Sequence, residues 1–173
     1  EYEKWLASPA LSEDERAELK ALEGNDKEIK ARFYGPLEFG TAGLRGTMYT
    51  GLHNMNRHVI RWATQGFANV IRAEGTEAMQ KGIAVCMDCR NHSAEFARET
   101  ACVMAANGIH VRLFESLRPT PELSFAVREY GCQAGVNVTA SHNPKEYNGY
   151  KVYWADGAQL PPQHAAAIAD ELT

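Results

Sequence analysis

The beginning of the chain has the pattern of short, charged helices. Charged side chains recur up to about Ala31. Ser12 and Glu15 have the spacing of a capping box, which predicts the start of a helix, and Gly24 is typical of the residue that follows a helix end. We therefore expect residues 1–32 to form an N-terminal helical arm.

Apolar runs and amphipathic stretches alternate in residues 33–173. Short, almost wholly apolar runs predict buried strands, and apolar residues recurring at intervals of three and four predict helices between them. Such an alternation favours an α/β fold, a three-layer α/β/α domain with a mostly parallel (mixed) sheet. The predicted elements are helices at Asn56 to Ala73, Ser93 to Asn107 (capped by Ser93) and Thr120 to about Gly131 (capped by Thr120), with strands at Ile83 to Met87, Val111 to Phe114 and Gly135 to Val138.

Two further segments are less regular. Phe39 to Gly51 is rich in glycine, and we expect a loop there. Tyr150 to Tyr153 and Gln159-Leu160 are spaced as a short antiparallel hairpin around Asp156-Gly157.

Composition narrows the functional classes. The formal charge of -4 is spread along the chain, and no cluster of lysine and arginine predicts a nucleic-acid partner. No apolar run reaches membrane-spanning length and no secretory signal opens the sequence, so we expect neither membrane insertion nor secretion. The chain starts without methionine and stops within a predicted helix at Thr173, from which we expect a fragment of a longer, multidomain protein.

The four cysteines allow two interpretations. Cys86 and Cys89 form a Cys-x-x-Cys pair, which suits redox chemistry or half of a zinc site. No second pair follows, since Cys102 and Cys132 are isolated. We favour small, reduced cysteines, one of them in a buried strand, and hence a cytoplasmic protein.

The richest chemistry follows the last predicted strand. Thr139 to Pro144 reads Thr-Ala-Ser-His-Asn-Pro, and Lys151 follows shortly after it. Polar residues also leave the same end of the two other strands, at Asp88 to Arg90 and at Ser116 to Arg118. Ligands of open parallel sheets bind at this edge, which makes Ser141 a candidate reactive group. The alternatives are simple turn chemistry and a serine hydrolase, and the second lacks a Gly-x-Ser-x-Gly elbow.

These motifs resemble those of a known family. Thr139 to Pro144 is similar to the phosphoserine loop of the α-D-phosphohexomutases, which include phosphoglucomutase and phosphomannomutase. Phe39 to Gly46 is similar to their glycine-arginine signature, and Asn148 to Gly157 to a third block. Arg118 to Leu123, together with Tyr153-Trp154, is closest to the phosphoglucomutase and phosphopentomutase branch.

The resemblance implies the N-terminal domain of a phosphosugar mutase, domain I, over residues 33–173. Such an enzyme interconverts sugar 1-phosphate and sugar 6-phosphate, or the pentose equivalents, through a phosphoserine, here Ser141, and a bisphosphate intermediate. Arg45, His142 and Lys151 are the expected catalytic partners. Either Lys151 or His142 suits the acid/base role, and a non-catalytic phosphoprotein or assembly module is the alternative function.

The resemblance also implies ligands and partners. Expected substrate or phosphate contacts are Thr41, Gly43, Gly46, Asn143 and Asn148. Mg²⁺ is expected on the phosphate of Ser141, with its other ligands on an aspartate loop outside this chain. Phosphosugar substrate, an activating sugar bisphosphate and the remaining domains of the enzyme are the expected partners. The identity of the sugar is not determined by these residues.

Overall fold

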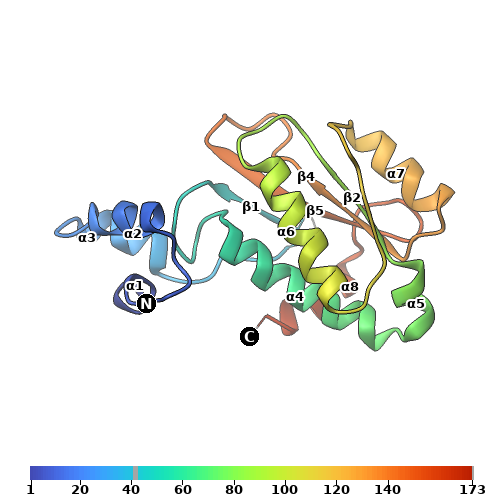
Figure 1. Ribbon diagram of the computed structural model, residues 1–173, viewed down its shortest axis with the longest axis horizontal. Coiled ribbons are helices and arrows are strands. Elements are labelled where there is room, and N and C mark those ends of the chain that lie inside the picture. Colours follow the sequence, from blue (N-terminus) through green and yellow to red (C-terminus); the bar gives the residue numbers. More distant parts are fainter. Residues whose placement is uncertain (41–42, 173) are drawn as a thin grey trace.

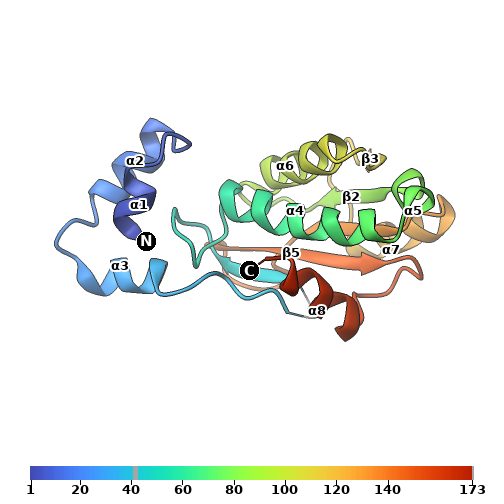
Figure 2. The same cartoon turned by 90° about the horizontal axis from the view of Figure 1, so that it is seen from below.

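The computed structural model describes residues 1–40 and 43–172, and its N-terminal helices form a group of their own. Figures 1 and 2 show this group at one end of the molecule, apart from the sheet. The predicted capping box is confirmed, because Ser12 and Glu15 exchange side-chain and backbone hydrogen bonds. Leu19 and Phe33 are buried in a small apolar core within the group. The helices are α1 (Tyr2–Leu6), α2 (Glu13–Lys20) and α3 (Asp26–Phe33).

Ion pairs join these helices to the rest of the chain. Glu15 contacts Arg57 at 2.5 Å and the His58 ring at 3.1 Å. Glu18 accepts a hydrogen bond from the Thr50 hydroxyl at 2.5 Å. The buried guanidinium of Arg32 pairs with Glu18. Charged groups therefore contribute to the junction together with Trp5, whose ring contacts that of His58.

The strands form one mixed sheet within the described residues. Its order is β1-β5-β4-β2-β3. Strand β2 pairs in parallel with β3 and β4, whereas β5 runs antiparallel to both β4 and β1. The mixed sheet is confirmed, and its antiparallel half arises because β5 returns directly beside β4. The strands are β1 (Leu44–Thr47), β2 (Ile83–Met87), β3 (Val111–Leu113), β4 (Ala134–Val138) and β5 (Tyr147–Trp154).

Helices cover both faces of this sheet, which confirms the three layers. Ile83 and Val85 of β2 pack into the core with α4 and α6, which lie side by side in Figure 1. Ala84 and Cys86 face the other way, against α7. Side chains alternate between faces along a strand, so the apolar strand predicted from the sequence serves two cores. The helices are α4 (Arg57–Ala73), α5 (Thr76–Lys81), α6 (Ser93–Ala106), α7 (Thr120–Glu129) and α8 (Pro162–Asp170).

Several local predictions were wrong. The glycine-rich segment contains strand β1, and its residue Leu44 is buried against β5. Helix α5 was not predicted. The expected short hairpin, by contrast, is confirmed, with an antiparallel bridge between Tyr153 and Gln159 and a hydrogen bond from the Leu160 amide to the Val152 carbonyl at 3.0 Å.

The two predicted helix caps were also wrong. Ser93 is the first residue of α6, and its hydroxyl donates to Asp88 at 2.8 Å. Thr120 is the first residue of α7, and its hydroxyl accepts a hydrogen bond from the Asn137 amide at 2.7 Å. Both hydroxyls therefore bind neighbouring elements instead of the first turn of their own helices.

The cysteines behave as small, reduced side chains. Cys86 and Cys132 are buried, Cys89 and Cys102 are exposed, and all four are free thiols. Burial raises the pKa of the Cys86 thiol to about 12, which keeps it protonated and unreactive. In the described ranges we find no helix with the length and apolar character needed to cross a bilayer.

Candidate active site

The connection between β4 and β5 presents Ser141 at the surface. Its backbone is left-handed, with φ of 57°, a conformation that a non-glycine residue adopts at an energetic cost. Its amide donates to the Thr139 hydroxyl at 3.0 Å, and its own Oγ lies 3.3 Å from Nδ1 of His142. Ser141 and His142 are both exposed. The predicted nucleophile is therefore accessible, with an imidazole beside it.

Arg90 holds the backbone of this connection. Its two terminal nitrogens donate to the carbonyl oxygens of three loop residues and of the first residue of β5 at 2.7–3.0 Å, and its Nε lies 3.4 Å from the carboxylate of Asp88. Asp88 and Arg90 also pair with each other, which fixes their own loop. The carbonyl contacts were missed, since a guanidinium that binds distant backbone leaves no spacing signal. The four carbonyls belong to Ser141, Asn143, Pro144 and Tyr147.

Strand β1 brings Arg45 to the same loop. Its guanidinium donates to Oδ1 of Asn143 at 2.9 Å, although the two residues are 98 positions apart. The Arg45 side chain is exposed, as a group that meets a ligand must be. Two predicted site residues from separate motifs therefore lie in direct contact.

Lys151 belongs to the same electrostatic environment. Partial burial, followed by the positive charge of Arg45, lowers the pKa of its ammonium, and Asp88 opposes this shift. Within the described residues no side chain accepts a hydrogen bond from Lys151, so its amine is available to a ligand. A lysine with a lowered pKa is better suited to exchange a proton near neutral pH.

Three residues that were predicted as phosphate contacts lie within the fold, next to other parts of the protein. Asn148 is fully buried, and its amide donates to the carbonyl of Asn91 and the hydroxyl of Ser93, both at 3.0 Å. The amide of Gly43 donates to the carbonyl of Gly40.

The third of these predicted phosphate contacts, Gly46, is buried in β1 opposite Asn148. The side chain of Asn148 and the amide of Gly43 thus bind other parts of the protein. Thr41, the fourth predicted contact of this kind, lies outside the described residues. Among the predicted contacts, Asn143 therefore remains the one beside Ser141 and Arg45.

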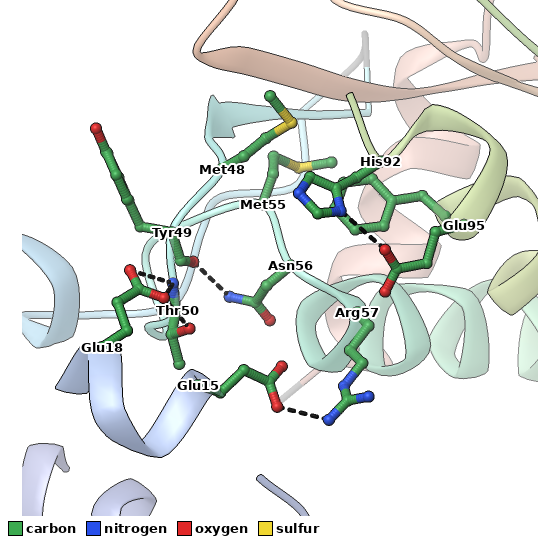
Figure 3. A pocket seen from close by; sticks show the side chains of 11 residues that line it. Glu15, Glu18, Met48, Tyr49, Thr50, Met55, Asn56, Arg57, His92 and Glu95 are labelled. Carbon is green, nitrogen blue, oxygen red and sulfur yellow. Dashed lines mark hydrogen bonds and ion pairs between the residues drawn. The ribbon is translucent and has the colours of Figure 1, made fainter. Parts of the chain in front are cut away.

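An open hollow of about 430 Å³ lies beside Ser141. A second, smaller hollow of about 140 Å³ lies between the N-terminal helices and the sheet domain. Figure 3 shows that its polar groups pair with one another, including Glu15 with Arg57, so nothing there requires a ligand. We therefore place the candidate site at the first hollow, which is lined by Asp88, Cys89, Arg90, Asn91, Ser141, Asn143 and Lys145.

The residues present do not make a magnesium site by themselves. In the part of the chain that the structure describes, no three histidine, cysteine or acidic side chains gather as metal ligands. The carboxylate that lines this hollow, Asp88, already accepts hydrogen bonds from the Ser93 hydroxyl and the Arg90 amide and pairs with the Arg90 guanidinium. A phosphate on Ser141 would offer one oxygen ligand. The geometry therefore supports phosphate binding by cations and leaves the metal to other parts of the protein.

Comparison with known proteins finds relatives whose names agree with one another. The human phosphopentomutase is 42% identical over 156 residues, which cover 87% of this chain and 26% of the relative. The phosphoglucomutase of Staphylococcus aureus is 43% identical over 136 residues, which cover 79% and 24%. The chain therefore spans about a quarter of the length of the curated relatives that it matches.

Solved structures agree with these relatives. The crystal structure of a proposed phosphomannomutase from Thermus thermophilus matches with a TM-score of 0.72 at 30% identity, over 80% of this chain and 30% of that one. Residues 36–173 match the family model for phosphoglucomutase/phosphomannomutase, alpha/beta/alpha domain I. The chain belongs to the phosphoglucomutase/phosphomannomutase family and contains its domain I.

Proposed function

We propose that the protein containing this chain is a phosphosugar mutase in which Ser141 carries the transferred phosphoryl group. The observation that supports this most strongly is the position of Ser141. It is an exposed hydroxyl on a fixed loop, with Arg45 bound to that loop and Lys151 within the electrostatic reach of Arg45. Phosphoryl transfer depends chiefly on such positioning and charge stabilisation.

The proposed reaction uses phosphoserine as donor. The bond from Ser141 Oγ to phosphorus breaks while the oxygen of a sugar hydroxyl forms the new bond to phosphorus. The sugar hydroxyl gives its proton to the acid/base group, and the departing Oγ takes up a proton to become the serine hydroxyl. The resulting sugar bisphosphate turns round and returns its other phosphoryl group to Ser141. Arg45 and Lys151 neutralise the three phosphoryl oxygens, since cationic donors favour the charged transition state. The overall reaction moves a phosphate between the 1-position and the 6-position, or its pentose equivalent.

Two groups are candidates for moving the proton. His142 lies with Nδ1 at 3.3 Å from Oγ of Ser141, and the lowered pKa of Lys151 makes its amine easier to deprotonate. Separate His142→Gln and Lys151→Met variants distinguish them. The variant that lacks the acid/base group loses the corresponding limb of the pH–rate profile.

The remaining parts of the proposal lie outside the described site. We expect Mg²⁺ to bind the phosphate of Ser141 together with ligands from the rest of the enzyme, and we expect the rest of the enzyme to select the sugar. The free thiols suit the reducing cytoplasm. Because the chain spans about a quarter of its relatives, we expect negligible mutase activity from these residues alone.

Intact-mass measurement of the full-length protein tests the proposal. We expect one phosphate on Ser141, lost when sugar phosphate is added and regained from sugar bisphosphate. Ser141→Ala should carry no such phosphate and show no turnover while retaining its fold. Full turnover by this variant, or a wild-type protein that neither carries phosphate nor turns over after priming with bisphosphate, would contradict the assignment.

A further inference from the structure

The guanidinium of Arg90 donates four hydrogen bonds from its two terminal nitrogens and forms an ion pair through Nε. An arginine side chain carries five N–H groups in a rigid, planar arrangement. Nη1 donates to the carbonyls of Pro144 and Tyr147 at 2.8 and 3.0 Å, and Nη2 to those of Ser141 and Asn143 at 2.9 and 2.7 Å. The fifth group, Nε, faces Asp88 at 3.4 Å.

Other polar side chains hold the guanidinium of Arg90 in this position. The carboxylate of Asp88 accepts from the Arg90 amide at 3.0 Å and from the Ser93 hydroxyl at 2.8 Å. Ser93 is in turn bound by the buried amide of Asn148, at 3.0 Å. Arg90 is thus fixed relative to the end of β2, the start of α6 and the start of β5. Its side chain is only 12% exposed, so it offers little surface to a ligand of its own.

The contacts act on the part of the loop that carries the reactive group. The left-handed backbone of Ser141 is unfavourable for a serine and must be held by its surroundings. Arg90 binds the carbonyl of Ser141 itself, and it binds Asn143 through the backbone while Arg45 binds the side chain of the same residue. One guanidinium therefore binds the backbone of both Ser141 and the residue that Arg45 contacts.

We propose that Arg90 is a positioning residue for phosphoryl transfer, which orients Ser141 by binding three carbonyls of its loop and that of the first residue of β5. This inference rests on the function proposed above. Its action is geometric and does not depend on positive charge alone. Lysine keeps the charge but has three donors on a single nitrogen, so it cannot bind four carbonyls and a carboxylate together.

The first test compares Arg90→Lys with wild type in the full-length enzyme. A misplacement of about 1 Å costs on the order of 10²-fold in rate, so we expect kcat to fall by roughly 10²-fold while KM changes little. The matched control is Arg61→Lys. Arg61 also makes paired contacts, to Glu99 at 2.6 and 2.7 Å, but these join α4 to α6 away from the loop. We expect this control to retain the wild-type kcat.

A second measurement reports on the loop without catalysis. Lys145 is exposed within the loop, next to the Pro144 carbonyl that Arg90 binds. We expect trypsin to cleave after Lys145 faster in Arg90→Lys than in wild type or in Arg61→Lys. If Arg90→Lys does not fold, Asp88→Asn replaces it in this assay, because it weakens the support of the same guanidinium. Cleavage at the wild-type rate would then overturn the proposal.

Chemical rescue separates geometry from charge. Guanidinium ion added to Arg90→Ala should raise kcat and slow cleavage after Lys145, whereas methylammonium at the same concentration should do neither. Equal rescue by both ions, or a wild-type kcat in Arg90→Lys, would overturn the geometric role. Ser141→Ala is assayed in parallel. If it is inactive and Arg90→Lys is normal, only the role of Arg90 fails; if it turns over, the proposed function fails.

Discussion

Replacing Gly43 by alanine should disturb both the sheet and the site. Gly43 has φ of +84°, and a Cβ added to it would lie 1.8 Å from the carbonyl oxygen of Tyr150. The next residue, Leu44, begins β1 and pairs with Tyr150. The obstacle is backbone of a central strand, which cannot rotate away as a side chain would. The alanine variant must therefore move β1 away from β5 or change the conformation of residue 43.

The expected loss of stability follows from the strain of an alanine at position 43 and from the shift of β1. A left-handed backbone costs a non-glycine residue about 1–2 kcal/mol. Relief of the overlap requires the 1.8 Å contact to reach at least 3.0 Å, the lower limit for a Cβ, so β1 must shift by about 1.2 Å. A backbone hydrogen bond lost in the shift adds about 1 kcal/mol. We expect Gly43→Ala to lower the free energy of unfolding by about 3 kcal/mol. Arg45 moves with β1, so kcat should fall by roughly 10²-fold.

Gly40→Ala is the matched control, since the same methyl group added three residues earlier meets nothing within 4 Å. Urea unfolding of both variants gives the two free energies, and steady-state turnover of the full-length enzyme gives kcat. We expect Gly40→Ala to lie within about 0.5 kcal/mol of wild type. Equal stabilities and equal kcat values for the two alanine variants would refute the argument that Gly43 is required by the approach of Tyr150.

Three further predictions concern other contacts. Asn148→Ala removes the donor that binds the buried Ser93 hydroxyl and the Asn91 carbonyl and should reduce the free energy of unfolding by about 2 kcal/mol, measured by thermal denaturation. Arg45→Gln removes a charge that lowers the pKa of Lys151, so this pKa should rise, and the pH–rate limb assigned to Lys151 should move to higher pH; an unmoved limb would exclude Lys151 as its source. Burial lowers the pKa of the His58 imidazole below its ordinary value of 6.5, and Glu15 opposes this shift. The contribution of His58 to stability is therefore fully present above pH 6.5 and is lost as the pH falls from 6.5 toward the lowered pKa. Glu15→Gln should lower that pKa further and enlarge the loss on acidification, which urea unfolding at several pH values measures.

The central elements were predictable because their pattern is strong. Strands β2 and β4 are buried along their whole length, and continuous apolar runs between amphipathic helices are typical of the central strands of a covered sheet. The position of Ser141 followed from the same pattern, since its loop leaves the carboxyl end of β4. Apolar periodicity therefore suffices to place the candidate nucleophile at the edge of the sheet where ligands bind.

Strand β1 could not be predicted in the same way. It has four residues, of which Leu44 and Gly46 are buried and Arg45 is exposed. Two buried positions are too few for a periodic signal, and glycine disfavours a strand. Its conformation is determined by pairing with β5, whose partner residues lie about a hundred positions away. Tertiary contact thus overrides local preference in β1.

The folded structure also decides which site residues can meet a ligand and which support the loop. Part of this division could be predicted from the sequence. Side chains alternate between faces along a strand, so Asn148 shares a face with Tyr150 and Val152, both of which are buried. Lys151 has the opposite parity and lies on the other face. Because a buried polar group must be hydrogen-bonded within the protein, an asparagine on the Tyr150 face has its amide occupied before any ligand arrives. Strand parity therefore places Asn148 and Lys151 on opposite faces of β5, whereas the burial and the hydrogen bonds of Asn148 depend on the folded structure.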